Sequence, residues 1–228
     1  MMVRHKFDRS LLPERPNLDF EINLWHRGVR IVAGVDEAGR GALAGPVAAG
    51  AVVLPAEFID LYNHLEGVQD SKVMNPTDRE HWAEEIKAVA IAWSVGFASV
   101  AEIDKIGILP ATQLAAGRAI QSLHCVVEHI LVDYINLPDV ALPQTPLVKG
   151  DARSLSIAAA SILAKTTRDA LLVELDETFP GYLFAKNKGY GTPEHRQAID
   201  RLGPCDQHRK TFSPVSDNFS LFPPEVEE

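Results

Sequence analysis

The chain has 228 residues, a net charge of −9 at neutral pH, and 46% hydrophobic and 23% charged residues. This length predicts one domain with a substantial core. Its two cysteines, Cys125 and Cys205, lie far apart, which excludes a disulfide framework and a cysteine zinc site. No apolar segment resembles a signal peptide or a membrane span, so we predict a cytoplasmic protein with no membrane association.

The first part of the chain is strand-rich. Residues 1–28 mix charges with prolines and predict an arm, with a short helix at Phe20–His26. Three β-type runs follow, at Val29–Asp36, Val47–Leu54 and Ala90–Ala98. Before the last run, Thr77 and Glu80 have the spacing of a capping box and predict a helix to about Ala88.

The rest of the chain alternates helices with short strands. Its predicted strands are Ile130–Asp133 and Pro146–Val148, and its predicted helices are Ala111–Glu128, Leu155–Phe179 and Pro193–Leu202. A loop is expected at Gly181–Thr192 and a polar tail at 214–228. This order of elements predicts an α/β fold with an antiparallel hairpin portion.

A polar stripe lies along the predicted helix Leu155–Phe179, which is otherwise apolar around most of its circumference. On a helical wheel, four polar residues lie on the same face of this helix: Ser161, Lys165, Arg168 and Asp169. A stripe of this kind on a buried helix must face other polar groups.

The most informative stretch is Gly34–Gly41, where an apolar run ends in Asp36 and Glu37 and is followed by a glycine-flanked arginine. Further acids follow buried elements at Asp133 and lie on the polar stripe at Asp169. Oxygen-only ligands favour Mg²⁺ or Mn²⁺ over zinc. Two such ions can activate a water and stabilise the leaving oxygen of a phosphodiester. The alternative for any single acid is a solvated turn residue or helix cap.

The charge of the chain is unevenly distributed. Residues 186–210 contain six Lys or Arg and three acids, so this segment is +3 and the remainder is −12. A local basic segment in an acidic protein suits an enzyme that holds metal ions beside a polyanion.

The motifs of this chain resemble those of ribonuclease HII. The first match is Val35–Gly41 followed by Ala44–Val47. Further matches follow in the same order at Asp70-Ser71-Lys72, Val132-Asp133, Lys149-Gly150-Asp151, Ala158–Lys165 with Arg168-Asp169, Lys188–Thr192 with His195, and Gly203-Pro204 with His208-Arg209. The resemblance covers residues 29–215, nearly the whole chain outside its two ends.

The resemblance implies a ribonuclease-H-like mixed five-stranded sheet flanked by helices over 29–215, with an arm at 1–28 and a flexible tail at 216–228. It implies an endonuclease (EC 3.1.26.4) that hydrolyses the RNA strand of RNA–DNA hybrids and nicks duplex DNA 5′ of single ribonucleotides. The implied mechanism uses two Mn²⁺ or Mg²⁺ ions in the substrate complex and leaves 5′-phosphate and 3′-hydroxyl ends. The implied metal ligands are Asp36, Glu37, Asp133 and Asp169.

Substrate recognition is also implied by the resemblance. The backbone of Gly39-Arg40-Gly41 and the side chain of Tyr190 would contact the 2′-hydroxyl, the group that distinguishes RNA from DNA locally. Lys72 would touch a backbone phosphate or the active site. Lys165 and Arg168 would either bind phosphate or neutralise the carboxylates.

Other basic residues have two open interpretations. Lys186, Lys188, Arg209 and Lys210 are candidates for contacts with the duplex backbone, or are solvated surface charges. The two histidines of the matching motifs, His195 and His208, are expected to pack or cap rather than to catalyse.

Some positions depart from the family pattern. Tyr134 follows Asp133 where a glycine is common, Val73 and Met74 replace lysine and leucine, and Asn187 stands where histidine is frequent. A geometric conflict also exists, because adjacent strand residues point to opposite faces. Asp36 and Glu37 would therefore reach one metal centre only where the strand is ending.

The tail carries a separate hypothesis. Asn218–Phe222 is similar to the short peptides that dock on the bacterial sliding clamp, and the alternative is that Leu221 and Phe222 pack on the domain. A monomer is expected.

Four other functions fit the pattern less well. A catalytically inactive nucleic-acid binder would share the fold, but the presence of all four acids speaks against it. Another metal nuclease of the same fold would have no reason for Gly-Arg-Gly with Tyr190, and ribonuclease HIII would carry a larger N-terminal domain. A nucleotide-binding module using Gly39–Gly45 lacks the required glycine spacing.

Overall fold

The computed structural model describes residues 7–219 except 9, 11 and 58, and it contains a five-stranded sheet in the order β3-β2-β1-β4-β5. Its strands are β1 Val32–Ala38, β2 Val47–Val53, β3 Ala92–Ala98, β4 His129–Asp133 and β5 Gln144–Leu147. The pairs β1–β2 and β2–β3 are antiparallel, whereas β1–β4 and β4–β5 are parallel. The predicted mixed five-stranded sheet is therefore confirmed.

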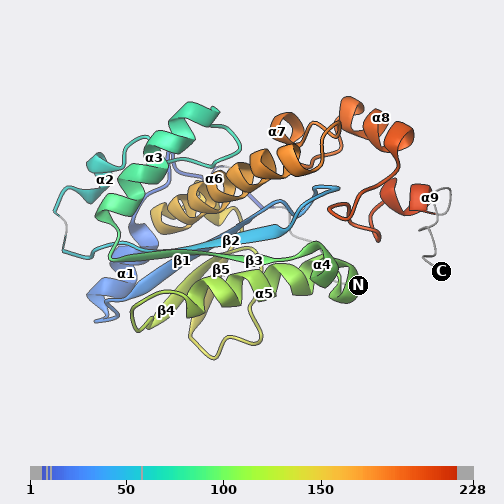
Figure 1. The fold of residues 1–228 in the computed structure, drawn as a ribbon. Helices are drawn as coiled ribbons and strands as arrows, with labels where there is room; N and C mark the ends of the chain where they lie inside the picture. The colour runs from blue at the N-terminus through green and yellow to red at the C-terminus, as the bar shows by residue number, and fades with distance from the viewer. Residues whose placement is uncertain (1–6, 9, 11, 58, 220–228) are drawn as a thin grey trace.

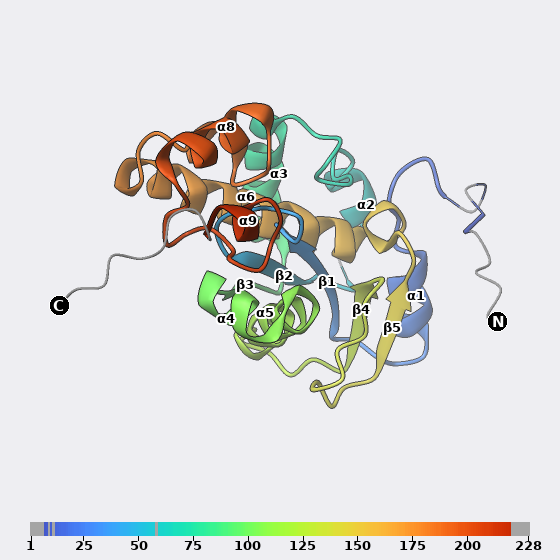
Figure 2. The ribbon, with the colours of Figure 1, turned by 90° about the vertical axis from the view of Figure 1, so that its right-hand side faces the viewer.

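Helices cover both faces of the sheet (Figure 1). They are α1 Asp19–His26, α2 Leu61–His64, α3 Pro76–Val89, α4 Val100–Ile106, α5 Ile108–Gln121, α6 Leu155–Thr178, α7 Phe184–Asn187, α8 Pro193–Leu202 and α9 Val215–Phe219, with a 3₁₀ turn at Gly150–Ala152. Figure 2 shows α4 and α5 on one side of the sheet and α3 and α6 on the other. The elements α7, α8 and α9 gather near the end of α6 that lies beyond the sheet.

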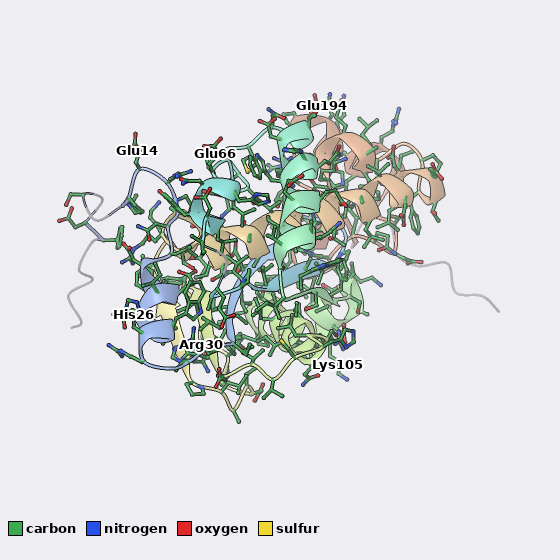
Figure 3. The ribbon with its side chains drawn as sticks, turned by 90° about the vertical axis from the view of Figure 1, so that its left-hand side faces the viewer. Glu14, His26, Arg30, Glu66, Lys105 and Glu194 are labelled. Atoms are coloured by element: carbon green, nitrogen blue, oxygen red, sulfur yellow. The ribbon has the colours of Figure 1, made fainter. Side chains whose placement is uncertain are left out.

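Two apolar cores result from the alternation of side chains along the central strands. Ala49, Ala51 and Val53 of β2 belong to the core shared with α5, whereas Val52 belongs to the core shared with α3 and α6. The polar side chains of Glu14, His26, Arg30, Glu66, Lys105 and Glu194 are exposed, as Figure 3 illustrates. No helix of the described residues is long and apolar enough to cross a membrane.

The backbone of α6 lies directly on the sheet because two strand glycines leave room for it. A Cβ atom on Gly34 would lie 2.2 Å from the carbonyl carbon of Ser156, and one on Gly50 would lie 2.3 Å from the carbonyl oxygen of Ala160. The side chains that α6 presents there are small, which permits the same close approach. This contact carries the polar stripe of α6 toward the end of β1.

Several boundaries differ from the sequence prediction. The N-cap of α3 is Asn75, whose side chain accepts a hydrogen bond from the Asp78 N–H at 2.9 Å, so the predicted cap at Thr77 is wrong. The predicted helix from Ala111 to Glu128 begins earlier and ends at Gln121. Its Pro110 lies in the first turn, where a missing N–H costs nothing.

Four short helices were not predicted. These are α2, α4, α7 and α9, and the last two lie in segments expected to be a loop and a tail. A capping box begins α4, since the Ser99 side chain accepts from Glu102 N–H while the Glu102 carboxylate accepts from Ser99 N–H. This signal is present in the sequence and could have identified the helix.

The predicted arm is attached to the domain through a buried carboxyl group. Glu21 of α1 is fully buried, and its Oε1 accepts hydrogen bonds from Ser154 Oγ at 2.6 Å, Ser156 Oγ at 2.6 Å and Ser156 N at 3.0 Å. Burial raises the pKa of this carboxyl group, against the opposing effect of these hydrogen bonds. The helix α1 is thus bonded to the start of α6.

Candidate active site

Three carboxylates meet where the parallel pairing of β1 with β4 ends. Val35 of β1 is paired with Val132 of β4, and each is followed directly by an aspartate. The carboxyl ends of parallel strands lie at the same edge, so Asp36 and Asp133 are neighbours. Asp151, in the 3₁₀ turn after β5, completes a group in which one oxygen from each carboxylate lies within 4.8 Å of the others.

Asp169 does not join this group, although it is predicted as a metal ligand. It lies further along α6, where Oδ1 accepts from Lys165 Nζ at 2.6 Å and Oδ2 lies 3.8 Å from an Arg79 nitrogen. Among the described residues, Asp151 stands with Asp36 and Asp133 instead. The sequence could have indicated Asp151 as a member of this group, because Asp151 follows another predicted strand, Pro146–Val148.

The strand β1 continues past both acids, contrary to the expected end at Asp36. Its ladder with β2 runs to Ala38, and Glu37 is opposite Ala49. Strand alternation therefore separates the directions of the Asp36 and Glu37 side chains. Glu37 accepts a hydrogen bond from Arg40 at 3.0 Å and lies outside the three-carboxylate group, yet close enough to raise the pKa of both Asp36 and Asp133.

The electrostatics of the three-carboxylate group favour a cation. Burial, followed by repulsion from Glu37 and Asp133, raises the pKa of Asp36 well above its usual range. Burial and the nearby Asp151 raise the pKa of Asp133 to about 6. Among the described residues, Asp36 Oδ2 is buried and has no hydrogen-bond partner. Buried, mutually repelling oxygens with one unpaired atom fit a hard divalent cation.

Lys72 supplies part of the opposing charge. Its Nζ donates to Asp151 Oδ2 at 2.9 Å and lies 3.7 Å from Asp70 Oδ1. Interaction with these carboxylates raises the pKa of Lys72 despite the opposing effect of burial, so the ammonium group stays charged. The Lys72 side chain is 66% exposed, which leaves it accessible from solvent.

A cleft of about 460 Å³ lies beside the three-carboxylate group. Its lining residues are Glu37, Ala38, Gly39, Arg40, Gly41, Ser71, Lys72, Arg79, Lys165 and Tyr190. A second cleft of about 680 Å³ shares three of these residues and adds Lys186 and Lys188. The structure thus brings together the predicted Gly-Arg-Gly motif and Tyr190 in one cleft, although 149 positions separate Gly41 from Tyr190 in the sequence.

Two arginines predicted to contact nucleic acid are buried instead. Arg168 donates to the carbonyls of Pro46 at 2.8 Å, Lys188 at 2.9 Å and Ala44 at 3.0 Å. Arg209 donates to the carbonyls of Gly39 at 2.7 Å, Arg40 at 2.8 Å and Gly45 at 3.0 Å. Neither side chain has any exposed surface. Burial therefore contradicts direct contact of Arg168 with phosphate and both interpretations of Arg209, as a duplex contact and as a solvated surface charge. Both residues instead stabilise the loop over 39–46.

The lysines have different surroundings. Lys165 is 16% exposed and bonded to Asp169, and burial lowers the pKa of its ammonium group. This pairing is with a carboxylate outside the three-carboxylate group. Lys188 donates from Nζ to the carbonyl of Ala185 at 2.6 Å and lines the second cleft. Lys186 pairs with Glu194 at 3.3 Å on the surface.

Two departures from the family pattern are accommodated by the backbone. Tyr134 has φ of +60°, so the chain after Asp133 adopts a left-handed conformation that glycine would reach at lower cost. Asn187 is buried, donates to the carbonyl of Tyr182 at 2.7 Å and accepts from Gly189 N–H at 2.8 Å. It therefore shapes the loop that leads to Tyr190.

Comparison with known proteins identifies the family. The family model described as Ribonuclease HII matches residues 33–215. A Ribonuclease HII from Anaeromyxobacter sp. (strain Fw109-5) is 52% identical over 206 residues, which cover 90% of this chain and 64% of that protein. One from Synechococcus sp. (strain JA-3-3Ab) is 53% identical over 203 residues, which cover 89% of this chain and 90% of that protein.

Solved structures give the same result for the fold. The ribonuclease H2 from Pyrococcus horikoshii OT3 is 26% identical with a TM-score of 0.69, covering 84% of this chain and 98% of that one. The Archaeoglobus fulgidus RNase HII, solved in a complex with PCNA, is 26% identical with a TM-score of 0.66, covering 82% and 96%. A Bst-RNase HIII in complex with Mn²⁺ shares the fold at 18% identity and a TM-score of 0.68, covering 85% and 70%. The chain therefore belongs to the ribonuclease HII family of metal-dependent ribonuclease H endonucleases.

Proposed function

We propose that this chain hydrolyses the RNA strand of RNA–DNA hybrids and nicks duplex DNA on the 5′ side of a single ribonucleotide, leaving 5′-phosphate and 3′-hydroxyl ends. The observation that carries the proposal is the position of the three-carboxylate group beside the cleft that holds Gly39-Arg40-Gly41 and Tyr190. One part of this site suits phosphodiester hydrolysis, and the other suits recognition of a sugar.

The proposed metal ligands are Asp36, Asp133 and Asp151, with Glu37 at the margin. Their oxygens suit Mg²⁺ or Mn²⁺, and two bound ions would activate the attacking water and stabilise the leaving oxygen. Gly150 N–H holds Asp133 by donating to its Oδ1 at 2.7 Å, which leaves the second carboxylate oxygen available. The assignment of Asp169 as a ligand is replaced by Asp151 in this proposal.

Selection for ribose is assigned to two groups that line the first cleft, the Gly39-Arg40-Gly41 backbone and Tyr190. Gly41 is exposed, and no described heavy atom lies within 4 Å of the position of an added Cβ, so a sugar can approach its backbone closely. The Tyr190 ring lies with its centroid 5.3 Å from Lys165 Nζ and lines the same cleft. A 2′-hydroxyl both donates and accepts hydrogen bonds, and backbone groups and a tyrosine hydroxyl complement both roles.

Basic residues would hold the duplex. Lys72 lines the first cleft, Lys188 lines the second, and Lys186 extends the same surface. Contacts of these ammonium groups with phosphates would supply affinity that falls with salt concentration. We assign Lys165 to stabilising Asp169 and the position of the Tyr190 ring.

The test uses a labelled DNA duplex that contains one ribonucleotide, with an all-deoxyribose duplex of the same sequence as the control. We expect a nick 5′ of the ribonucleotide with Mg²⁺ or Mn²⁺ and none with EDTA. Asp36→Asn and Asp133→Asn should abolish the nick while the far-ultraviolet circular dichroism stays unchanged. A metal-independent nick, or equal cleavage of the control duplex, would contradict the proposal.

A sliding clamp is the proposed protein partner. The Archaeoglobus fulgidus relative was solved with PCNA, and the segment Asn218–Phe222 here is similar to clamp-docking peptides. Residues 220–222 of that segment lie outside the described residues. The test is clamp binding by the intact chain and by a Leu221→Ala, Phe222→Ala double variant. Binding that the double variant retains would refute the assignment.

A further inference from the structure

A pair of buried histidines is hydrogen-bonded to the backbone of Tyr190 and lies outside the three-carboxylate group. His195 lies in the first turn of α8, and His208 precedes Arg209; neither side chain has exposed surface. Their Nε2 atoms are 3.1 Å apart. His195 Nδ1 is 2.9 Å from the carbonyl oxygen of Tyr190, and His208 Nδ1 is 3.0 Å from Cys205 N. The four groups form one continuous chain of hydrogen bonds.

The Tyr190 carbonyl determines which atom donates and which accepts in each hydrogen bond of this series. A carbonyl oxygen only accepts, so His195 Nδ1 must carry the proton. In neutral His195 the Nε2 atom then accepts, which makes His208 Nε2 the donor. His208 Nδ1 is left to accept from the Cys205 N–H and from the Cys205 thiol, whose Sγ lies 3.2 Å away. The reverse order would place two acceptors face to face at Tyr190.

The surroundings of the pair keep both imidazoles neutral. Burial, followed by the proximity of His195, lowers the pKa of His208 to about 4, and burial also lowers the pKa of His195. The aromatic ring of Phe184 lies 5.4 Å from the His195 ring and 5.5 Å from the His208 ring. Tyr182 packs on His208 from another side, with ring centroids 4.8 Å apart. Close packing of this kind fixes both rings.

The same short segment also holds the backbone of Gly39 and Arg40, which lines the same cleft as Tyr190. Arg209 directly follows His208 and donates to the carbonyls of Gly39 and Arg40. Its N–H donates to the carbonyl of Leu43 at 2.9 Å, and His208 forms a β-bridge with Ala44. Two consecutive residues are therefore connected to both groups that line the cleft, His208 to Tyr190 by way of His195 and Arg209 directly to the Gly39-Arg40 backbone.

We propose that His208, acting through His195, is a positioning residue that fixes the separation between Tyr190 and the Gly39-Arg40-Gly41 backbone. This separation determines how strongly the enzyme discriminates ribose from deoxyribose at the cleft. The inference rests on the proposed function, because it requires Tyr190 to contact the sugar. Neither histidine lines the cleft, so both act through the Tyr190 main chain.

A double-mutant cycle with His195→Leu and Tyr190→Ala tests the proposal, with kcat/KM for nicking at a single ribonucleotide as the measurement. We expect His195→Leu to lower kcat/KM about tenfold in the wild-type background, the equivalent of one buried hydrogen bond. In the Tyr190→Ala background the same change should have no further effect. An equal loss in both backgrounds would overturn the inference, whereas an unaffected Tyr190→Ala single variant would overturn the proposed function itself.

Two further variants separate positioning from stability. In His195→Asn, the side-chain amide nitrogen occupies nearly the position of Nδ1 and can still donate to the Tyr190 carbonyl, so most of the lost kcat/KM should return. Val215→Ala removes apolar volume from the same buried cluster, and it should lower the melting temperature without changing kcat/KM. Failure of His195→Asn to exceed His195→Leu would contradict the role assigned to the hydrogen bond.

A measurement on the unaltered protein remains available if the variants do not fold. Nitrogen-15 NMR of the imidazoles at pH 7 should show the Nδ1–H tautomer for His195 and the Nε2–H tautomer for His208. An imidazolium ion at either position, or the opposite tautomers, would overturn the proposal.

Discussion

Gly39 and Gly41 flank Arg40 in one loop, and the structure predicts opposite consequences of adding a methyl group to each. Gly39 has φ of +89°, and an added Cβ would lie 2.0 Å from Nε of Arg168. Gly41 does not have a left-handed backbone, and no described heavy atom lies within 4 Å of its added Cβ. Gly39→Ala and Gly41→Ala are therefore a matched pair of variants.

The expected effect on stability follows from two costs. A left-handed conformation costs a non-glycine residue about 1–3 kcal/mol. Displacing Arg168 also disturbs its bonds to the carbonyls of Ala44, Pro46 and Lys188, and losing one hydrogen bond from a charged donor costs about 1.5–3 kcal/mol. We expect Gly39→Ala to lower the free energy of unfolding by about 3–5 kcal/mol. Gly41→Ala should change it by less than about 0.5 kcal/mol.

Thermal denaturation followed by circular dichroism measures the difference. For a chain of this size the melting temperature of Gly39→Ala should fall by about 6–20 °C, and that of Gly41→Ala by no more than about 2 °C. Nicking at a single ribonucleotide should nevertheless fall in Gly41→Ala, because the methyl group enters the cleft. The reasoning is refuted if Gly39→Ala melts with the wild type, or if both variants lose the same stability.

Three other predictions concern the acids and a histidine. Asp151→Asn should lower the rate of metal-dependent nicking by about two orders of magnitude or more, whereas Asp169→Asn should keep most of it; the reverse order in a single-turnover assay would restore Asp169 as a ligand. Glu21→Ala should lower the free energy of unfolding, measured with urea, by about 2–4 kcal/mol, because it leaves buried donors of Ser154 and Ser156 unpaired. Glu21→Gln keeps an acceptor and should lower it by less than about 1 kcal/mol. Similar losses for the two Glu21 variants would contradict this account. The low pKa of His208, about 4 in the folded chain and 6.5 in the unfolded chain, means that the unfolded state binds a proton first as the pH falls. Protonation linked to His208 should therefore lower the free energy of unfolding by about 3 kcal/mol between pH 6.5 and 4. In His208→Asn the free energy of unfolding should fall less steeply over this range. If it fell equally steeply in both proteins, His208 would not titrate in this way.

The sequence predicted the strands because they are apolar runs, and the family resemblance implied the mixed five-stranded sheet. Asp36 and Asp133 each follow such a run, and the parallel pairing of β1 and β4 brings them together. The pattern did not indicate how far β1 extends, because Asp36 and Glu37 look like the end of a strand. Pairing with β2 decides this boundary, and pairing is a tertiary property.

Arg168 and Asp169 show the limit of a helical wheel. Their positions on the polar stripe are correct, but the wheel gives a direction and not the identity of the groups found there. Backbone carbonyls of a loop from another part of the chain meet Arg168, and Lys165 meets Asp169. Glu21 is a similar case. Its partners Ser154 and Ser156 are more than 130 positions away along the chain, and nothing in its local sequence indicates that they will bond to its carboxyl group.

The two buried arginines have a consequence for the attraction of a polyanion to a chain whose net charge is −9. Arg168 and Arg209 donate their hydrogen bonds to carbonyls rather than to carboxylates. A guanidinium group stays protonated in proteins, and burial lowers the pKa of Arg209 only to about 9. Salt screens buried charges much less than exposed ones. The two guanidinium groups therefore contribute positive charge beneath the 39–46 loop, and salt weakens this contribution less than that of the surface lysines. For the proposed substrate, this charge acts at the cleft although neither arginine has exposed surface.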